Sequence, residues 1–179
     1  MKIKTNYRWV IKIVAISVVA SMIFTLVSSE ILGNVGYITA FAVLAVFILL
    51  GILFDIIGVA VTAASPAPFH SMAAHREKGA REALRLLKNA EKVSSFCNDV
   101  VGDVSGIVSG STASLVVARL VADTDGEDLI PQLVMAGLVS GLMIGGKAIG
   151  KTIALNNSTG IVLQAGKLIS LTSRRNSHK

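Results

Sequence analysis

The sequence predicts an all-α membrane protein with about four transmembrane helices and two amphipathic juxtamembrane helices on the cytosolic side. Three observations predict this class. Hydrophobic residues make up 53% of the chain and charged residues only 16%, whereas a soluble domain is about a quarter charged. The apolar residues gather in four long runs, and the Lys and Arg residues gather beside alternate ends of these runs.

The first apolar run, Trp9–Val27, contains one charged residue, Lys12. It is long enough to cross a bilayer core of ~30 Å. A cleavable signal peptide is the alternative, since two serines follow the run, but the apolar core of a signal peptide is only about 7–15 residues long. We therefore expect an extra N-terminal transmembrane helix (or signal peptide) at 1–29, a transmembrane domain at 36–173 and a basic tail at 174–179.

The second run, Gly36–Ala64, is interrupted only by Asp55, and the prolines of the S-P-A-P segment that follows predict the end of its helix. Residues Met72–Phe96 change character, with basic residues outnumbering acidic ones and Ala and Leu recurring at helical spacing. This pattern is typical of a basic amphipathic helix on the cytosolic membrane surface. A charged helix that lies in solvent is the alternative.

The third run extends from about Asn98 to Ala122, and the fourth from Leu129 to Ile149. The acidic loop Asp123–Asp128 joins them, and Arg119 can reach toward it. Asn156–Leu171 is predicted to form the second interfacial amphipathic helix.

The positions of the charges predict the topology. Basic segments alternate with loops that contain acids but no Lys or Arg; the basic segments are 1–8, 70–92 and 147–179, and the loops are 30–35 and 123–128. Because Lys and Arg mark cytoplasmic loops, four spans with both termini in the cytoplasm satisfy the positive-inside rule at every loop. We therefore predict a multi-pass protein of the cell membrane, in contact with the lipid bilayer.

Glycines recur every four residues in the third and fourth runs. They are Gly102, Gly106 and Gly110 in the third run, and Gly137, Gly141 and Gly145 in the fourth. Small residues at this spacing let another membrane helix approach closely. The two tracks predict helix packing, either between the copies of a homodimer or between helices of one subunit.

Charged residues interrupt three of the predicted spans at a similar depth. Asp55 and Asp103 each lie 19 residues, and Lys147 lies 18 residues, from the predicted outer ends of their runs. At 1.5 Å per residue, all three lie about 27–29 Å below the outer surface. Charged groups inside a membrane usually pair with one another at functional sites. The interpretation is a cation pathway or its remnant; alternatively, Lys147 extends to the inner interface and the acids bond to serine or backbone groups.

Two further patterns bear on enzyme function. Residues Gly145–Thr152, GGKAIGKT, match the nucleotide-binding pattern G-x-x-x-x-G-K-[ST], but that loop requires a preceding strand, and here an apolar span precedes it. We expect no phosphate loop there. No constellation of catalytic His, Ser or Cys is visible, so we expect no enzymatic activity and no nucleic-acid partner.

Four segments carry a family resemblance: VTAAS at 61–65, KGAREALRLLKN at 78–89, VGD at 101–103 and GKAIGKTIALNN at 146–157. Together they resemble the transmembrane domain of the CNNM/CorC (CorB-like) family over Phe54–Ser173. That family is associated with the transport or homeostasis of magnesium and other divalent cations. The resemblance implies Mg²⁺ or another divalent cation as a transported ligand rather than a resident cofactor.

The resemblance also implies an ion site. In the family, a dehydrated Mg²⁺ is held by an F-S-G-S-E stretch, a G-N pair and a G-E pair on three helices. By position these fall on Phe54–Gly58, Gly102-Asp103 and Gly146-Lys147. Asp55 and Asp103 are therefore implied as metal ligands, and Lys147 replaces the family's metal-binding Glu. Mg²⁺ requires octahedral oxygen ligands, and an ammonium repels a divalent cation, so we hypothesise that Lys147 occupies the cation's place and pairs with Asp103, Asp55 or both.

Two functions remain open. The first is a divalent-cation transporter domain, with changed selectivity, built as a homodimer. The second is a non-transporting membrane scaffold that acts as the partner subunit of a related transporter. The retained acids Asp55 and Asp103 favour the first function, and Lys147 favours the second.

Overall fold

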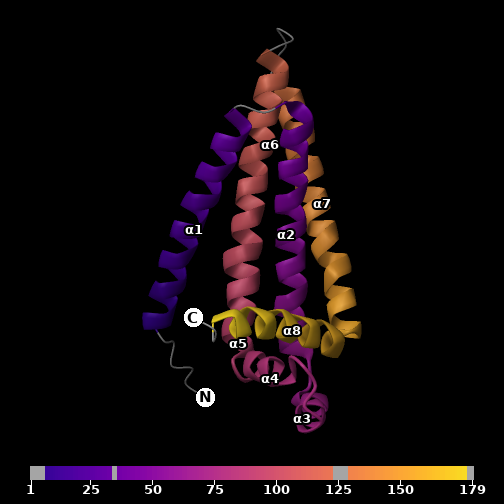
Figure 1. Cartoon of the computed structure of the whole chain (residues 1–179). Coiled ribbons are helices and arrows are strands. Elements are labelled where there is room, and N and C mark those ends of the chain that lie inside the picture. Colours follow the sequence, from indigo (N-terminus) through magenta and orange to yellow (C-terminus); the bar gives the residue numbers. More distant parts are fainter. Residues whose placement is uncertain (1–6, 34–35, 123–128, 177–179) are drawn as a thin grey trace. The chain divides into compact units, whose positions relative to one another are not determined.

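The computed structural model describes residues 7–33, 36–122 and 129–176, and within these ranges every regular element is a helix (Figure 1). The elements are α1 (Tyr7–Gly33), α2 (Tyr37–Ala63), α3 (Pro66–Ala74), α4 (Ala80–Lys88), α5 (Ala90–Ser95), the π-helix η1 (Phe96–Asp103), α6 (Val104–Ala122), α7 (Leu129–Asn156) and α8 (Ser158–Asn176). The basic segment at 1–6, the acidic loop at 123–128 and the end of the basic tail at 177–179 lie outside the described residues.

Four helical segments are long and apolar enough to cross a membrane: Tyr7–Val27, Tyr37–Ala63, Ala90–Ala122 and Leu129–Asn156. They correspond to the four apolar runs, so the prediction of an all-helical, multi-pass membrane protein is confirmed. The third segment begins eight residues before its predicted start, because charged residues such as Glu91 and Lys92 are good helix formers and extend the helix beyond its apolar part.

The segment predicted as one amphipathic helix, Met72–Phe96, is divided among three short helices. The first, α3, begins at Pro66, where the missing N–H of proline leaves no helical bond unmade. It ends in a Schellman motif, in which the backbone N–H of Glu77 donates to the carbonyl of Met72 at 2.9 Å. Arg76 adopts the left-handed conformation of this motif, with φ of 57°, so the helix cannot continue.

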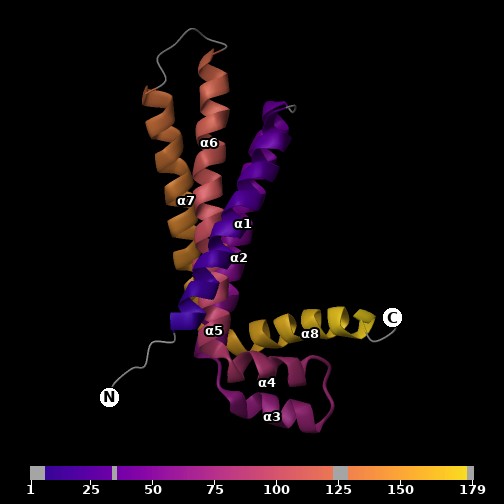
Figure 2. The ribbon, with the colours of Figure 1, turned by 90° about the vertical axis from the view of Figure 1, so that its left-hand side faces the viewer.

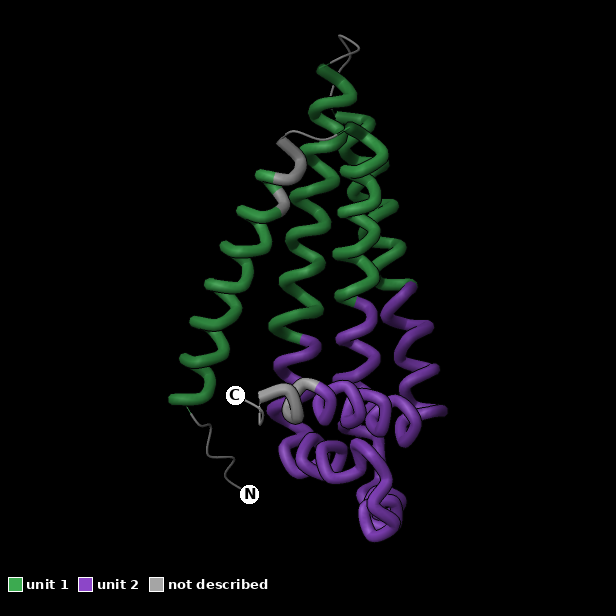
Figure 3. Tube along the Cα trace, viewed as in Figure 1, with its two compact units in different colours: residues 1–51, 99–145 green, residues 52–98, 146–179 purple. Residues whose placement is uncertain are grey.

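The chain divides into two compact units (Figure 3). Unit 1 comprises Met1–Gly51 and Asp99–Gly145, and unit 2 comprises Ile52–Asn98 and Gly146–Lys179. The boundary therefore passes through three long helical segments, and each unit is assembled from parts of the chain that are distant in sequence.

Unit 1 is held together by aromatic and small side chains. Helix α1 packs against α6, and the ring of Phe24 on α1 meets that of Phe47 on α2 edge to face, at 5.7 Å between centroids. The buried face of α6 is small and polar, and its Ser109 Oγ donates to the carbonyl of Ser105 at 2.7 Å. Apolar side chains cover most of the rest of α1 and are exposed, as expected for a helix in contact with lipid.

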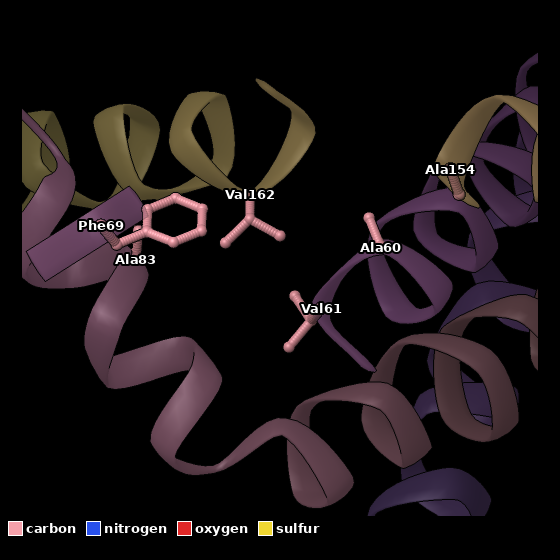
Figure 4. Packing of buried hydrophobic residues seen from close by; sticks show 6 residues of the cluster. All are labelled: Ala60, Val61, Phe69, Ala83, Ala154 and Val162. Atoms are coloured by element: carbon pink, nitrogen blue, oxygen red, sulfur yellow. The ribbon is translucent and has the colours of Figure 1, made fainter. Parts of the chain in front are cut away.

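Unit 2 has its own hydrophobic core, built from the short helices and the ends of two long ones. Helix α4 packs against both α8 and α3 (Figure 2). Fully buried Phe69 of α3 lies beside Val162 of α8 and Ala83 of α4 (Figure 4). The apolar face of α4 is therefore covered by protein, whereas the sequence left open whether that face meets lipid or solvent.

Two glycines allow α8 to cross α4 at backbone contact. A Cβ at Gly166 would meet the carbonyl oxygen of Gly79 and would lie 2.9 Å from the backbone nitrogen of Ala83. Gly79 has φ of 84°, a conformation that favours glycine, and a Cβ there would lie 2.8 Å from the Cα of Lys167. An ion pair of 3.6 Å between Lys167 and Glu77 lies beside this crossing.

Candidate cation site

Close packing between α2 and α7 builds the candidate site in unit 2. Gly146 of α7 faces the side chain of Ile52 on α2, and one turn further along both helices Gly150 faces Ile56. A Cβ at Gly150 would lie 2.6 Å from Cγ1 of Ile56. The two isoleucines thus fill the spaces beside two glycines at the same four-residue spacing, which is how ridges of one helix fit the grooves of another.

This packing brings a lysine and an aspartate together. Lys147 follows Gly146, Asp55 precedes Ile56, and the Lys147 Nζ lies 3.8 Å from the Asp55 Oδ1. The distance is longer than a direct hydrogen bond. The two side chains are 25% and 17% exposed, so they are largely removed from solvent.

The ion pair makes two costly charges tolerable inside the membrane-crossing segments. An isolated lysine or aspartate at the centre of a membrane helix is unfavourable by roughly 2.5–3.5 kcal/mol. When the two meet, the charge of the pair is zero, and each carries the counter-charge that the other requires. The arrangement is chemically suited to one monovalent ammonium beside one carboxylate.

Asp103, the other predicted acid, belongs to unit 1. It is the last residue of η1 and its side chain is exposed, whereas the preceding Gly102 is buried. Its meeting with the Lys147–Asp55 pair stays a prediction. Among the described residues no group of three or more His, Cys, Asp or Glu side chains is placed to hold a metal ion.

A polar contact that the sequence analysis missed lies one turn from Asp55 on α2. The Oδ1 of Asn98 is buried without a hydrogen-bond partner among the described residues, and it faces Gly58 at the place where a Cβ would stand. A glycine Cα–H pointing at an oxygen in this way forms a weak hydrogen bond. The Nδ2 of Asn98 lies 3.4 Å from the Oγ of Ser94, and the amide thus joins α5 and η1 to α2.

Gly58 has a second meaning in the light of the family resemblance. It stands where the F-S-G-S-E stretch has its Glu, so this chain lacks that carboxylate. The amide oxygen of Asn98 occupies the adjoining space. The only advance signal for this contact was the polar residue Asn98 at the start of an apolar run.

The predicted glycine tracks are placed in different surroundings. Gly106 faces Met143 Cε at 3.4 Å from its would-be Cβ, which is ordinary contact. Four other glycines have no atom of the described chain within 4 Å of a would-be Cβ; they are Gly110, Gly137, Gly141 and Gly145. Their role in packing between subunits stays a prediction.

The segment Gly145–Thr152, which resembles a phosphate-binding loop, lies wholly within α7. Its backbone N–H groups are part of a continuous helix rather than of a loop between a strand and a helix. They therefore cannot form the cradle that a phosphate loop requires.

Comparison of the chain with family models, with curated proteins and with solved structures finds no match.

Proposed function

We propose that this multi-pass membrane protein is built on the divalent-cation transporter scaffold of the CNNM/CorC type, with a degenerate ion site in which the Lys147 ammonium replaces the bound cation. The observation that supports the proposal is the ion pair of 3.8 Å between Lys147 and Asp55, on two membrane-crossing helices. In the family these two positions belong to the Mg²⁺ site. The ammonium thus lies beside a carboxylate at the position where the family holds Mg²⁺.

The charges explain how such a site would select its ligand. A divalent cation that approached Asp55 would meet the positive charge of Lys147 at a distance at which like charges repel by several kcal/mol in a partly buried site, about 4 kcal/mol at an effective dielectric constant of 20. Lysine also contributes no oxygen to an octahedral shell. Mg²⁺ therefore binds only when Lys147 leaves Asp55 or is replaced.

Uptake of Mg²⁺ into liposomes tests the proposal. The full-length protein is reconstituted with a Mg²⁺-sensitive dye inside the vesicles, and the wild type is compared with Lys147→Glu, which restores the family's ligand, and Lys147→Met, which removes the charge at similar length. We expect uptake by Lys147→Glu to exceed that of the wild type by roughly tenfold or more, with Lys147→Met between them.

Two outcomes would contradict the proposal. One is wild-type uptake as fast as that of Lys147→Glu, which would show that Lys147 does not obstruct the site. The other is a folded Lys147→Glu that neither takes up Mg²⁺ nor binds Mn²⁺, used as a spectroscopic substitute. The double variant Asp55→Asn/Lys147→Glu is the matched control, and it should lose the gain because it lacks the acid.

The second candidate function is a non-transporting scaffold that binds a second copy or a related transporter subunit. It is favoured by α7, where Gly137, Gly141 and Gly145 have open space beside them at the spacing that membrane helices use to pair. We propose that this face joins two copies in a homodimer.

Disulfide cross-linking distinguishes that candidate. In a Cys97→Ser background, Gly141→Cys should form a disulfide-linked dimer on oxidation in membranes, because paired glycine faces bring Cα atoms within reach of a disulfide. Ser140→Cys, an exposed neighbour on another side of the helix, is the control. Equal cross-linking at both positions, or none at Gly141→Cys, would rule out this face as a dimer contact.

The topology is also a proposal. We place both termini and the short helices α3, α4 and α8 on the cytoplasmic side of the cell membrane, since the basic residues of the chain gather there. Labelling of single cysteines in intact cells tests it: Arg85→Cys should be protected from an impermeant reagent, and Gly36→Cys should react.

A further inference from the structure

Helix α4 carries a basic stripe along one face. Arg81, Arg85 and Lys88 follow one another at spacings of four and three residues, which places them in a row, and all three are exposed. Ala80 and Ala83, which are fully buried, lie on the opposite side of the helix. We call these three cations the basic stripe.

The basic stripe lacks counter-charges within the described parts of the chain. None of its three residues forms an ion pair there. Glu77, the acid that would stand one turn before Arg81, is instead paired with Lys167 of α8. Three cations in a row repel one another, so the stripe is more stable when an anion from outside the chain binds it.

The neighbouring helix indicates which anion is available. Helix α8 begins two residues after α7, a membrane-crossing helix, ends. Its side opposite buried Val162 and Gly166 presents Leu168 and Leu171, which are 65% and 67% exposed. An amphipathic helix in this position, with leucines outward, lies in the membrane interface.

The basic stripe lies close to that interface. Helices in contact are about 8–10 Å apart, and α4 and α8 are in backbone contact at Gly79 and Gly166. The stripe is therefore separated from the headgroup region by about one helix layer, comparable to the Debye length of about 8 Å at physiological salt. Lys and Arg at this distance are attracted by anionic headgroups.

We propose that the basic stripe of α4 binds the headgroup phosphates of anionic lipids in the leaflet next to unit 2. The inference does not depend on the proposed cation site. Lys147 and Asp55 take no part in it, and a failure of either proposal leaves the other standing.

Native mass spectrometry of the full-length protein tests this proposal. The protein in neutral detergent is titrated with phosphatidylglycerol, and phosphatidylcholine serves as the uncharged comparison. The stripe variant is Arg81→Gln/Arg85→Gln/Lys88→Gln. The matched control, Arg8→Gln/Lys92→Gln/Lys151→Gln, removes the same charge from three exposed sites on α1, α5 and α7.

We expect the wild type to bind phosphatidylglycerol more tightly than phosphatidylcholine. The stripe variant should lose roughly 100-fold in apparent affinity, the value that about 1 kcal/mol for each of three cations implies. The control should lose less than about a tenth of that factor. The charge-retaining variant Arg81→Lys/Arg85→Lys/Lys88→Arg should bind like the wild type, and high salt should weaken wild-type binding.

Several results would overturn the proposal. An equal loss in the stripe variant and the control would show that the chain's total charge, rather than the stripe, attracts the lipid. Equal binding of the two lipids by the wild type would remove the preference altogether. Displacement of the lipid by inorganic phosphate or by a soluble poly-glutamate peptide at the same concentration would assign the stripe to a free anion or an acidic protein. Thermal unfolding in detergent checks that each variant is folded, and the salt titration of the wild type tests the proposal without any variant.

Discussion

The two ends of α7 carry glycines at the same spacing in opposite surroundings. Near its C-terminal end, Gly146 and Gly150 face Ile52 and Ile56 of α2, which fill the spaces that the glycines leave. Toward its N-terminal end, the glycines at 137, 141 and 145 have no neighbour within 4 Å of a would-be Cβ. The comparison teaches that glycine spacing identifies a surface that a helix can approach. A partner helix with branched side chains at the matching spacing decides whether that surface is used within the chain.

The largest expected effect is at Gly166, where a backbone rather than a side chain approaches the glycine. In Gly166→Ala the new methyl group would meet the carbonyl of Gly79 and the nitrogen of Ala83, and a helix backbone cannot rotate away. We expect a loss of about 3 kcal/mol in the free energy of unfolding, measured by titrating sodium dodecyl sulfate into mixed micelles. Ala165→Gly, one residue away, is the control and should lose no more than about 1 kcal/mol.

Gly58→Ala tests a glycine that faces a single polar group. The methyl group would displace the Oδ1 of Asn98 and with it the contact of that amide with Ser94. Because a side chain can rotate, we expect a smaller loss of about 1–2 kcal/mol in the same assay. The double variant Gly58→Ala/Asn98→Ala should recover part of that loss, and a double variant that loses the sum of the two single effects would show that the residues do not interact.

The comparison within α7 is tested directly by Gly150→Ala and Gly141→Ala. At Gly150 the methyl group meets the end of Ile56, so we expect a loss of about 1 kcal/mol as the isoleucine moves from its rotamer. At Gly141 the space is open, and alanine should stabilise the monomer by up to about 1 kcal/mol, because it favours helix. Equal effects of the same sign at both positions would contradict the difference between the two ends.

The smallest effect concerns a place where glycine is absent although the backbone favours it. Arg76 adopts a φ of 57° at the end of α3, a conformation in which a side chain is strained. Arg76→Gly should therefore stabilise unit 2 by about 0.5 kcal/mol, part of the strain being offset by the greater freedom of glycine in the unfolded chain. Arg76→Ala, which keeps a Cβ, should give no such gain in the thermal midpoint of unfolding.

Much of the fold was predictable because hydropathy alone defines the long helices. A lone Lys12 or Asp55 does not interrupt a run of some twenty apolar residues, and all four predicted spans are present. The internal breaks of Met72–Phe96 were not predicted, since they depend on the left-handed conformations of Arg76 and Gly79, which hydrophobic periodicity does not reveal.

The candidate site was predictable in part for the same kind of reason. Counting residues along helices indicated that Asp55 and Lys147 lie at a similar depth, and they form an ion pair. The count could not indicate which faces meet, because that depends on how Ile52 and Ile56 fit against α7. The contact of Asn98 with Gly58 depends on the fold between distant segments and has no pattern of its own in the sequence.

The crossing of α4 and α8 at Gly79 and Gly166 has a consequence for biosynthesis. While the ribosome is still translating α7, α4 is complete, but the helix that covers Ala83 does not yet exist. The nascent chain must therefore hold an uncovered apolar surface beside the membrane until α8 emerges, and contacts between such distant segments form late. During that interval a chaperone or the lipid surface has to shield α4, and a ribosome stalled before Ser158 would leave that surface open to aggregation.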